Sequence, residues 1–210
     1  MATKRAPLLA ISTDHPEPNR LRLAAEHLRN EEVVVYPTDT IYGLAVDIES
    51  RRGIEKLYAL RKLDPKKPLS VVCASVSEAS AYAAISNECF RFMRRVLPGP
   101  YTFVLKATPK VPKTGDHKRR AVGIRIPESN VARALVEALG RPVLSTSAII
   151  DEDAPAGVSD PVALAERYGA FVAMVLDGGI LEGTPSTVVD WTGDEPVVLR
   201  QGAGDVSDLL

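Results

Sequence analysis

Apolar residues recur with two different periods along this chain, and the period changes from one segment to the next. The spacing within residues 20–30 gives one apolar helical face, formed by Leu21, Leu23, Ala24, Ala25 and Leu28. The β-branched run that ends at Tyr36 is typical of a strand, and Pro37 ends it. By the same criteria helices are predicted at 20–30, 53–60, 88–96, 131–139 and 161–169, and strands at 8–12, 32–36, 44–48, 69–74, 102–107, 122–126, 143–147, 172–176, 186–190 and 196–200.

Polar residues and glycine mark several helix ends. Ser75 with Glu78 fits a capping box at the start of a further helix. Ser129 or Asn130 is expected to cap the helix that stops before Gly140. Helices and strands alternate, but several strands follow one another near the C-terminus. We therefore expect an α/β fold in which one twisted, mixed sheet carries flanking helices. Since no linker rich in Gly and Ser interrupts residues 1–210, we expect a single domain.

Composition and charge narrow the functional classes only a little. The chain is 45% hydrophobic and 25% charged, which is ordinary for a globular domain. Its net charge of -1 gives no overall reason to expect nucleic acid or a membrane as a partner. Cys73, Cys89 and the three histidines fall in no metal-ligand spacing, so no metal site is predicted. The apolar run near the N-terminus is too short for a signal or a membrane span, which predicts a cytoplasmic protein.

Common catalytic and nucleotide motifs are missing, but polar clusters stand at the ends of predicted strands. The chain has no Gly-x-x-x-x-Gly-Lys-Ser/Thr loop, no Gly-x-Gly-x-x-Gly after its first strand and no Gly-x-Ser-x-Gly. In open α/β sheets, ligands bind outside the carboxyl ends of strands. The clusters that such a site would use lie at 36–43, 61–68, 144–148, 183–190 and 198–202.

Each cluster also has a purely structural interpretation. Thr38 and Thr40 could hold a carboxylate or phosphate, or could satisfy the backbone of their own turn. The basic loop could neutralise a triphosphate, or could be a solvated surface loop; its cations are Arg61, Lys62, Lys66 and Lys67. Hydroxyls at Ser145 and Ser147 should share one strand face, with Thr146 on the other.

Two arginines occupy strands and differ in what they imply. Arg200 leaves the last predicted strand, where a surface ion pair would explain it equally well. Arg125 lies in an otherwise apolar strand, and a charge there is costly unless it is paired or faces a ligand. Arg125 is therefore the more informative of the two.

Taken together, these segments resemble the Sua5/YrdC/YciO family, over about residues 20–205. The matching stretches, which occur in the family's order, are Tyr36-Pro37-Thr38-Asp39-Thr40-Ile41-Tyr42-Gly43-Leu44, Leu97-Pro98-Gly99-Pro100-Tyr101-Thr102-Phe103-Val104-Leu105, Val122-Gly123-Ile124-Arg125-Ile126-Pro127, Ser145-Thr146-Ser147-Ala148, Pro185-Ser186-Thr187-Val188-Val189-Asp190 and Leu199-Arg200-Gln201-Gly202. The resemblance implies a single YrdC-like domain with a concave, cationic face. The chain is similar to the short form, without the C-terminal domain of the longer Sua5 type.

The resemblance also implies a reaction. Characterised members make threonylcarbamoyl-adenylate from threonine, bicarbonate and ATP, with a magnesium ion, for the t6A modification of tRNA. Carried over by motif, Thr102, Ser147 and Arg200 would face the nucleotide, together with Arg61, Lys66 and Lys67. Thr38 or Thr40, Arg125, Thr146 and Ser186 would meet the amino acid or its carbamate. Arg61, Lys62 and Ser147 are the predicted catalytic residues.

At several positions this chain lacks the residues that the family's synthetases carry, and these differences favour the YciO branch. The resemblance implies a Lys-x-Arg pair before the Pro68-Leu69 strand, and here those positions hold Arg61 and Leu63. The Asn expected after Ser147 is Ile149, and a His expected in the strand falls near Val72.

Three hypotheses follow from these departures. One is a threonylcarbamoyl-AMP synthase-like enzyme. Another is a non-catalytic protein that binds double-stranded RNA or the ribosome. A third is an enzyme acting on a related carbamoyl- or acyl-adenylate, as in hydrogenase maturation.

Overall fold

The computed structural model describes residues 5–64, 68–112, 121–149 and 158–207. Within them, eleven strands form one mixed sheet, whose order is β1-β10-β2-β3-β8-β4-β7-β6-β12-β13 with β5 beside β6. The strands are β1 Leu8–Ala10, β2 Val34–Tyr36, β3 Gly43–Asp47, β4 Ser70–Val72, β5 Ala83–Ala84, β6 Tyr101–Ala107, β7 Ala121–Arg125, β8 Val143–Ser147, β10 Met174–Asp177, β12 Thr187–Asp190 and β13 Val197–Arg200. A separate pair joins β9 Val158–Ser159 to β11 Leu181–Glu182. The predicted twisted, mixed sheet with flanking helices is confirmed.

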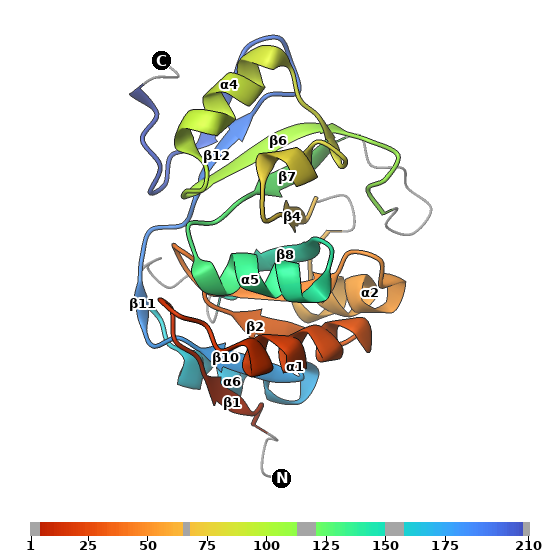
Figure 1. Cartoon of the computed structure of the whole chain (residues 1–210), viewed down its shortest axis with the longest axis vertical. Coiled ribbons are helices and arrows are strands. Elements are labelled where there is room, and N and C mark those ends of the chain that lie inside the picture. The colour runs from red at the N-terminus through yellow and green to blue at the C-terminus, as the bar shows by residue number, and fades with distance from the viewer. Residues whose placement is uncertain (1–4, 65–67, 113–120, 150–157, 208–210) are drawn as a thin grey trace.

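Helices cover both faces of the sheet, as Figure 1 shows. They are α1 Pro18–Arg29, α2 Arg51–Leu60, α3 Val76–Ala79, α4 Asn87–Val96, α5 Asn130–Leu139 and α6 Pro161–Tyr168, with a 3-10 turn, η1, at Gly169–Phe171. Helices α1 and α5 pack side by side on one face, with residues such as Leu28 and Leu135 buried against Val34 and Val143. Helices α2, α4 and α6 pack on the other face.

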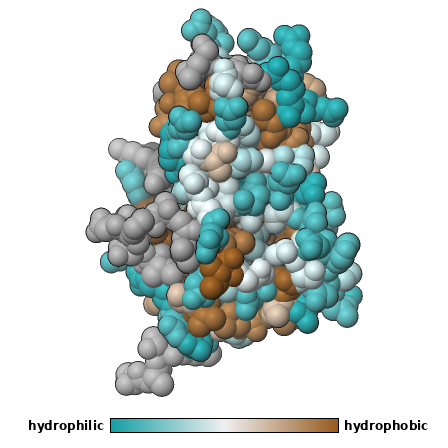
Figure 2. All heavy atoms as spheres, turned by 90° about the vertical axis from the view of Figure 1, so that its left-hand side faces the viewer, coloured by the Kyte–Doolittle hydropathy of each residue, from teal (hydrophilic) through white to brown (hydrophobic). Residues whose placement is uncertain are grey.

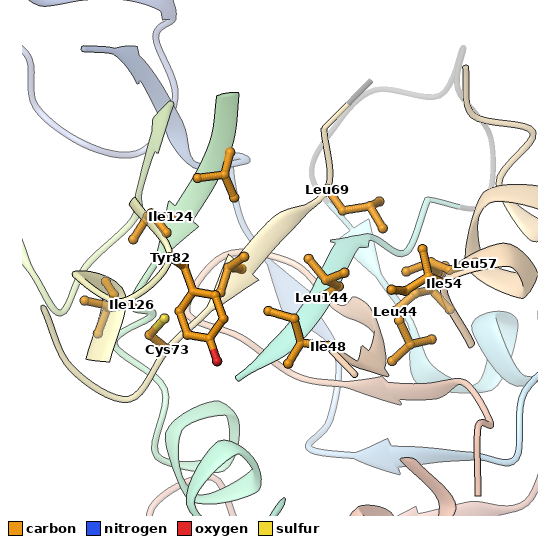
Figure 3. Packing of buried hydrophobic residues seen from close by; sticks show 14 of the residues in the cluster. Leu44, Ile48, Ile54, Leu57, Leu69, Cys73, Tyr82, Ile124, Ile126 and Leu144 are labelled. Atoms are coloured by element: carbon orange, nitrogen blue, oxygen red, sulfur yellow. The ribbon is translucent and has the colours of Figure 1, made fainter. Parts of the chain in front are cut away.

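The second face carries the larger core. Leu57 of α2, Leu164 of α6 and Phe92 of α4 pack with strand residues such as Leu44 and Phe103. Figure 3 shows part of this cluster, where Ile48, Ile54 and Leu144 lie together between the sheet and α2. The near-complete burial of these side chains removes apolar surface from water, at roughly 25 cal/mol per Å². This core fixes the sheet on which the polar side chains below are mounted.

Local sequence signals account for most helix ends. Ser129 Oγ accepts a hydrogen bond from Ala132 N at 3.2 Å, and Gly140 ends α5 with a φ of +81°. Ser75 Oγ accepts from Glu78 N at 3.1 Å, as the capping box predicts. The carboxylate of Glu78 bonds to Ala74 N rather than to Ser75 N, one residue earlier than the motif implies.

Some predictions need correction. Leu23 was placed on the apolar face of α1, but its side chain is exposed, because the buried face is narrower than the apolar stripe. The strand expected at 69–74 is only β4, and that expected at 8–12 is only β1. The two-residue strands β5, β9 and β11 were missed, since pairing with a distant partner defines them rather than a local pattern.

The surface is varied in hydropathy. On the side that Figure 2 shows, hydrophobic residues form separate patches between hydrophilic side chains and residues of intermediate hydropathy. Among the helices of the described ranges, none is both long and apolar enough to cross a membrane.

Candidate functional site

A pocket of about 380 Å³ lies on the same face of the sheet as α1 and α5, over strands that these two helices do not cover. Its floor is one row of residues on five neighbouring strands: Arg200, Val188, Thr102, Arg125 and Val72. Arg200 pairs with Val188, Val188 with Thr102, and Arg125 with Val72. Thr102 and Arg125 become neighbours because Phe103 pairs with Ile124. Side chains in one row of a sheet point to the same face, so the register itself brings these groups together.

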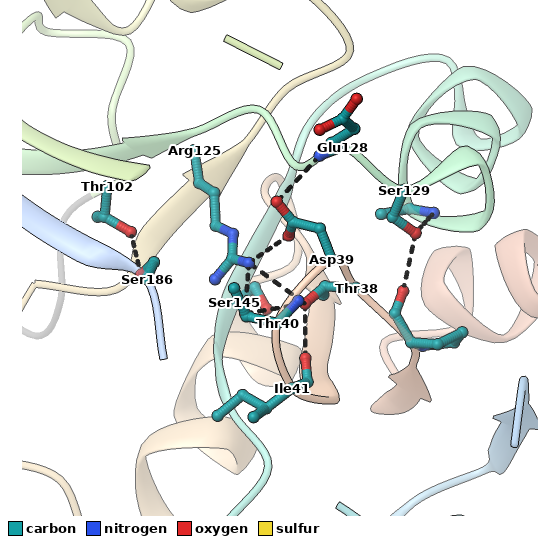
Figure 4. A network of polar contacts seen from close by, with 12 residues as sticks. Thr38, Asp39, Thr40, Ile41, Thr102, Arg125, Glu128, Ser129, Ser145 and Ser186 are labelled. Atoms are coloured by element: carbon teal, nitrogen blue, oxygen red, sulfur yellow. Dashed lines mark hydrogen bonds and ion pairs between the residues drawn. The ribbon is translucent and has the colours of Figure 1, made fainter. Parts of the chain in front are cut away.

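Arg125 anchors the polar side of this pocket. Its Nη2 donates to Asp39 Oδ1 at 2.6 Å, Thr40 Oγ1 at 2.7 Å and Thr38 Oγ1 at 3.2 Å (Figure 4). The other oxygen of Asp39 accepts from Glu128 N at 3.1 Å, so this carboxylate is held from two sides. Asp39 and Arg125 are both nearly buried. Pairing therefore offsets the cost of burying two charges, and it aims the guanidinium across the floor.

One atom of Arg125 remains available in this arrangement. Within the part of the chain that the structure describes, its buried Nε has no hydrogen-bond partner. A buried donor without an acceptor is costly, and native structures rarely retain one without a reason. Arg125 also lines the pocket, so an anion bound there would lie near a guanidinium whose hydrogen bonds are incompletely satisfied.

A hydroxyl pair and a second guanidinium stand beside Arg125. Thr102 Oγ1 and Ser186 Oγ lie 3.0 Å apart, and both are buried. Arg200 Nη2 donates to the Ser186 carbonyl at 2.7 Å. The pKa of Arg200 is lowered, first because protein atoms displace its hydration water and then because of the charge of Arg125. Two cations are thus held near each other, an arrangement that an anion between them would stabilise.

The close approach of β13 to Ser186 depends on a glycine. A Cβ atom at Gly202 would lie 2.0 Å from the Pro185 carbonyl oxygen, so only glycine fits where the chain leaves β13. The Gly202 N–H also donates to Thr187 Oγ1 at 2.9 Å. These contacts place Arg200, whose side chain is partly exposed, at the edge of the pocket.

The end of β8 supplies three hydroxyls. Alternation along the strand puts Ser145 and Ser147 on one face and Thr146 on the other, yet all three line the pocket. Tyr36 Oη donates to Ser145 Oγ at 2.9 Å. Burial raises the pKa of Tyr36, so its phenol stays neutral and remains a donor.

The opposite wall of the pocket is largely apolar. Leu63 and Ile149 line it, and Val72 lies in the floor beside them. Arg61 is the cation on this wall, and it hydrogen bonds to the Tyr168 hydroxyl. Tyr168 Oη in turn donates to the Ile149 carbonyl at 2.5 Å. The positions that depart from the synthetase pattern are therefore all in the pocket.

The structure brings most predicted site residues together but not all of them. The predicted residues that line the pocket are Thr38, Arg61, Thr102, Arg125, Thr146, Ser147, Ser186 and Arg200. Thr40 does not line the pocket, but its hydroxyl accepts a hydrogen bond from Arg125. Lys62 was expected at the nucleotide but lines a different cavity, because its φ of +48° turns it away from Arg61 and Leu63. Lys66 and Lys67 lie outside the described residues.

Several participants had no individual role in the sequence-based site. Tyr36, Asp39 and Ser145 belong to the polar network, and the sequence places them in the clusters at 36–43 and 144–148 without assigning them a function. Tyr168, outside every predicted cluster, supports the apolar wall. A tyrosine at the end of an apolar strand was the available signal for Tyr36, because a buried phenol needs a partner. Tyr168 gave no such signal, since its contacts are with residues 19 and 107 positions away in the chain.

The chemistry of the lining suits anions. Three arginines and several hydroxyls face the pocket, and no Asp or Glu is among the described lining residues. Nor do the described ranges contain a cluster of three or more His, Cys, Asp or Glu side chains that could hold a metal ion. Guanidinium forks and hydroxyls bind phosphate and carboxylate oxygens well.

Comparison with known proteins gives consistent relatives. Residues 26–202 match the Sua5_yciO_yrdC family model, described as "Telomere recombination". The chain is 39% identical to the uncharacterized protein YciO of Escherichia coli K12 over 95% of this chain and 97% of that one. It is 30% identical to the threonylcarbamoyl-AMP synthase of Pyrococcus abyssi, over 90% of this chain and 56% of that longer protein.

Solved structures agree with this relationship. The crystal structure of E. coli YciO superposes with a TM-score of 0.89 at 36% identity, over 98% of this chain and 100% of that one. P. abyssi Sua5 in complex with L-threonine superposes with a TM-score of 0.86 at 27% identity, over 96% of this chain and 59% of that one. The sequence motifs, the fold and these similarities lead to one conclusion: the chain belongs to the Sua5/YciO/YrdC family.

Proposed function

We propose that the pocket binds ATP and threonine and forms threonylcarbamoyl-adenylate at a low rate. The observation that carries this proposal is the convergence of Arg61, Arg125 and Arg200 on one pocket lined with hydroxyls. A nucleoside triphosphate needs cations to neutralise it, and a small amino acid needs donors for its carboxylate. The similarity to a threonylcarbamoyl-AMP synthase over 90% of this chain supports the same assignment.

In the proposed reaction, the threonine amine and bicarbonate first condense to a carbamate and release water. An oxygen of that carbamate attacks the α-phosphorus of ATP, and the bond to pyrophosphate breaks. Arg200 and Arg61 would offset the charge that develops on the phosphate oxygens, while Arg125 and Thr38 would orient the amino acid. No covalent intermediate with the protein is required.

The low rate follows from the apolar wall. Leu63 and Ile149 offer no hydrogen bonds, although they line the pocket beside Arg61. Removal of one donor to a transition state costs about a hundredfold to a thousandfold in rate. An enzyme that lacks two such donors would still bind its substrates but would turn them over slowly.

Product detection tests the proposal directly. Purified protein is incubated with ATP, magnesium, bicarbonate and threonine, and threonylcarbamoyl-adenylate is measured by mass spectrometry. We expect product only when all three substrates are present, and less of it with Arg200→Ala. No product above the controls at any protein concentration would contradict the proposal.

The same apolar wall favours a second candidate, a binding protein without turnover. In that case the arginines would hold phosphates of double-stranded RNA, and affinity would fall steeply with salt. Binding of a labelled RNA duplex, measured by fluorescence anisotropy between 50 and 200 mM salt (roughly a hundredfold loss or more for several phosphate contacts), separates the two. RNA binding with ATP binding but no product would favour this candidate.

A further inference from the structure

A second cavity lies apart from the pocket just described, between the ends of α1, α2 and α6 and the start of β2. Its volume is about 790 Å³, within the range of small-molecule sites. Four Lys or Arg residues line it: Arg5, Lys56, Lys62 and Arg167. The lining includes a single acidic residue among the described ones, Glu32. This local excess of positive charge contrasts with the net charge of -1 for the whole chain.

The cations differ in how they are satisfied. Arg5 pairs with Glu166, and Lys56 Nζ donates to the Glu31 carbonyl at 2.8 Å. Glu32 is itself engaged by His27, with Oε2 and Nδ1 2.6 Å apart. Neither Lys62 nor Arg167 has an ion-pair or hydrogen-bond partner within the described residues. Two charges on the wall of this cavity are therefore available to a ligand.

An aromatic side chain stands at the same place. Phe171 lines the cavity and is 69% exposed, the largest exposed fraction among the large hydrophobic residues of the described chain. Contact between an exposed aromatic ring and water is unfavourable. A flat ligand stacked on the ring would remove that apolar surface from water. The buried Tyr168, Val33 and Val172 provide the rest of an apolar wall.

From these observations we infer that the cavity is a second binding site, for a small doubly charged anion that carries a flat apolar ring. Lys62 and Arg167 bind the charged group, and Phe171 stacks on the ring. This inference goes beyond the proposed function and does not depend on it, because the two cavities share none of their described lining residues.

Two contacts connect the second site to the first pocket. Lys62 lines the second cavity, whereas its chain neighbours Arg61 and Leu63 line the first pocket. Tyr168 lines the second cavity, while its hydroxyl holds both Arg61 and the carbonyl of Ile149. A ligand in the second site would therefore contact residues that are direct neighbours of the first pocket's wall.

Phenyl phosphate is a suitable probe, because it combines a ring with a phosphate dianion. It is titrated into the ¹⁵N-labelled full chain, and the amide shifts of Ala170, Phe171 and Val172 are followed. We expect saturable shifts there, and binding at least about tenfold weaker for inorganic phosphate or phenol alone. The double variant Lys62→Ala/Arg167→Ala should weaken phenyl phosphate at least about tenfold, and Phe171→Ala about threefold to tenfold.

A matched control separates a built site from a general charge effect. Arg91→Ala/Lys106→Ala removes the same charge from two exposed residues that line neither cavity, and it should leave the affinity unchanged. In wild type, we also expect the amides of Arg61 and Ile149 to shift on binding, and Tyr168→Phe should abolish those shifts.

Several outcomes would overturn the inference. These are shifts confined to Thr146 and Ser147, no saturation at residues 170–172, or equal weakening in both double variants. Each of them leaves the product assay for the first pocket unaffected, so failure here is distinguishable from failure of the proposed function.

Discussion

The two walls of the pocket are built on the same sheet but differ in chemistry. On one wall, Arg125, Asp39 and Thr38 form a buried network whose positions are held by several hydrogen bonds. On the other, Leu63 and Ile149 present aliphatic surface around Arg61. The first wall carries guanidinium and hydroxyl groups that suit an anion, whereas Leu63 and Ile149 on the second wall offer no hydrogen-bond donors. Under the proposed function, this difference would allow substrates to bind without rapid turnover.

The largest effect is expected from removing the centre of the polar wall. Arg125→Leu would leave Asp39 buried without its partner, and breaking such a pair costs about 3–5 kcal/mol. We expect this loss in the free energy of unfolding, measured by urea denaturation. The double variant Arg125→Leu/Asp39→Leu should recover most of it. A loss below about 1 kcal/mol in the single variant would mean that the network does not organise this wall.

The apolar wall can be tested by adding donors to it. Leu63→Arg with Ile149→Asn should raise the rate of threonylcarbamoyl-adenylate formation by at least about a hundredfold, the effect of a single donor, because each change adds a donor beside Arg61. The rate is measured with saturating substrates, and Leu63→Met with Ile149→Leu serves as a size control. If the rate in the double variant does not rise, the substrates do not contact this wall of the pocket.

A smaller effect is expected where the polar wall is exposed. Arg200→Ala should weaken ATP binding about tenfold in isothermal titration, since one charge-assisted contact is lost. Its unfolding free energy should change by less than about 0.5 kcal/mol, because this side chain lies at the surface. Arg91→Ala, on the exposed face of α4, is the matched control. If both variants weaken binding equally, only the total charge matters.

The smallest expected effect concerns the support of β8. Tyr36→Phe removes the hydrogen bond to Ser145 and should cost about 1 kcal/mol in unfolding free energy. ATP affinity should fall by no more than about threefold, because Tyr36 positions Ser145 and carries no charge. An ATP affinity reduced as much as in Arg200→Ala would instead place the phenol in direct contact with the ligand.

Local patterns in the sequence were sufficient for the main helices, for most of the longer strands and for Arg125 and Thr38 of the polar wall. Helix spacing, caps such as Ser129 and the strand that ends at Tyr36 depend on neighbours a few residues away, so they can be derived from the chain alone. Arg125 was equally informative, because a charge in an apolar strand demands a partner or a ligand wherever that strand lies.

Only the tertiary structure decided which of these groups meet. Arg200, Thr102 and Arg125 are neighbours because of strand order and register, which depend on pairings between residues far apart in the chain. The same is true of Tyr168, whose hydroxyl reaches Arg61 and Ile149 from α6. Lys62 illustrates the limit most clearly. In the sequence, Lys62 belongs to the same cluster of cations as Arg61. Its own left-handed backbone conformation directs it to a separate cavity. The pattern of charges along the chain does not predict such a backbone conformation.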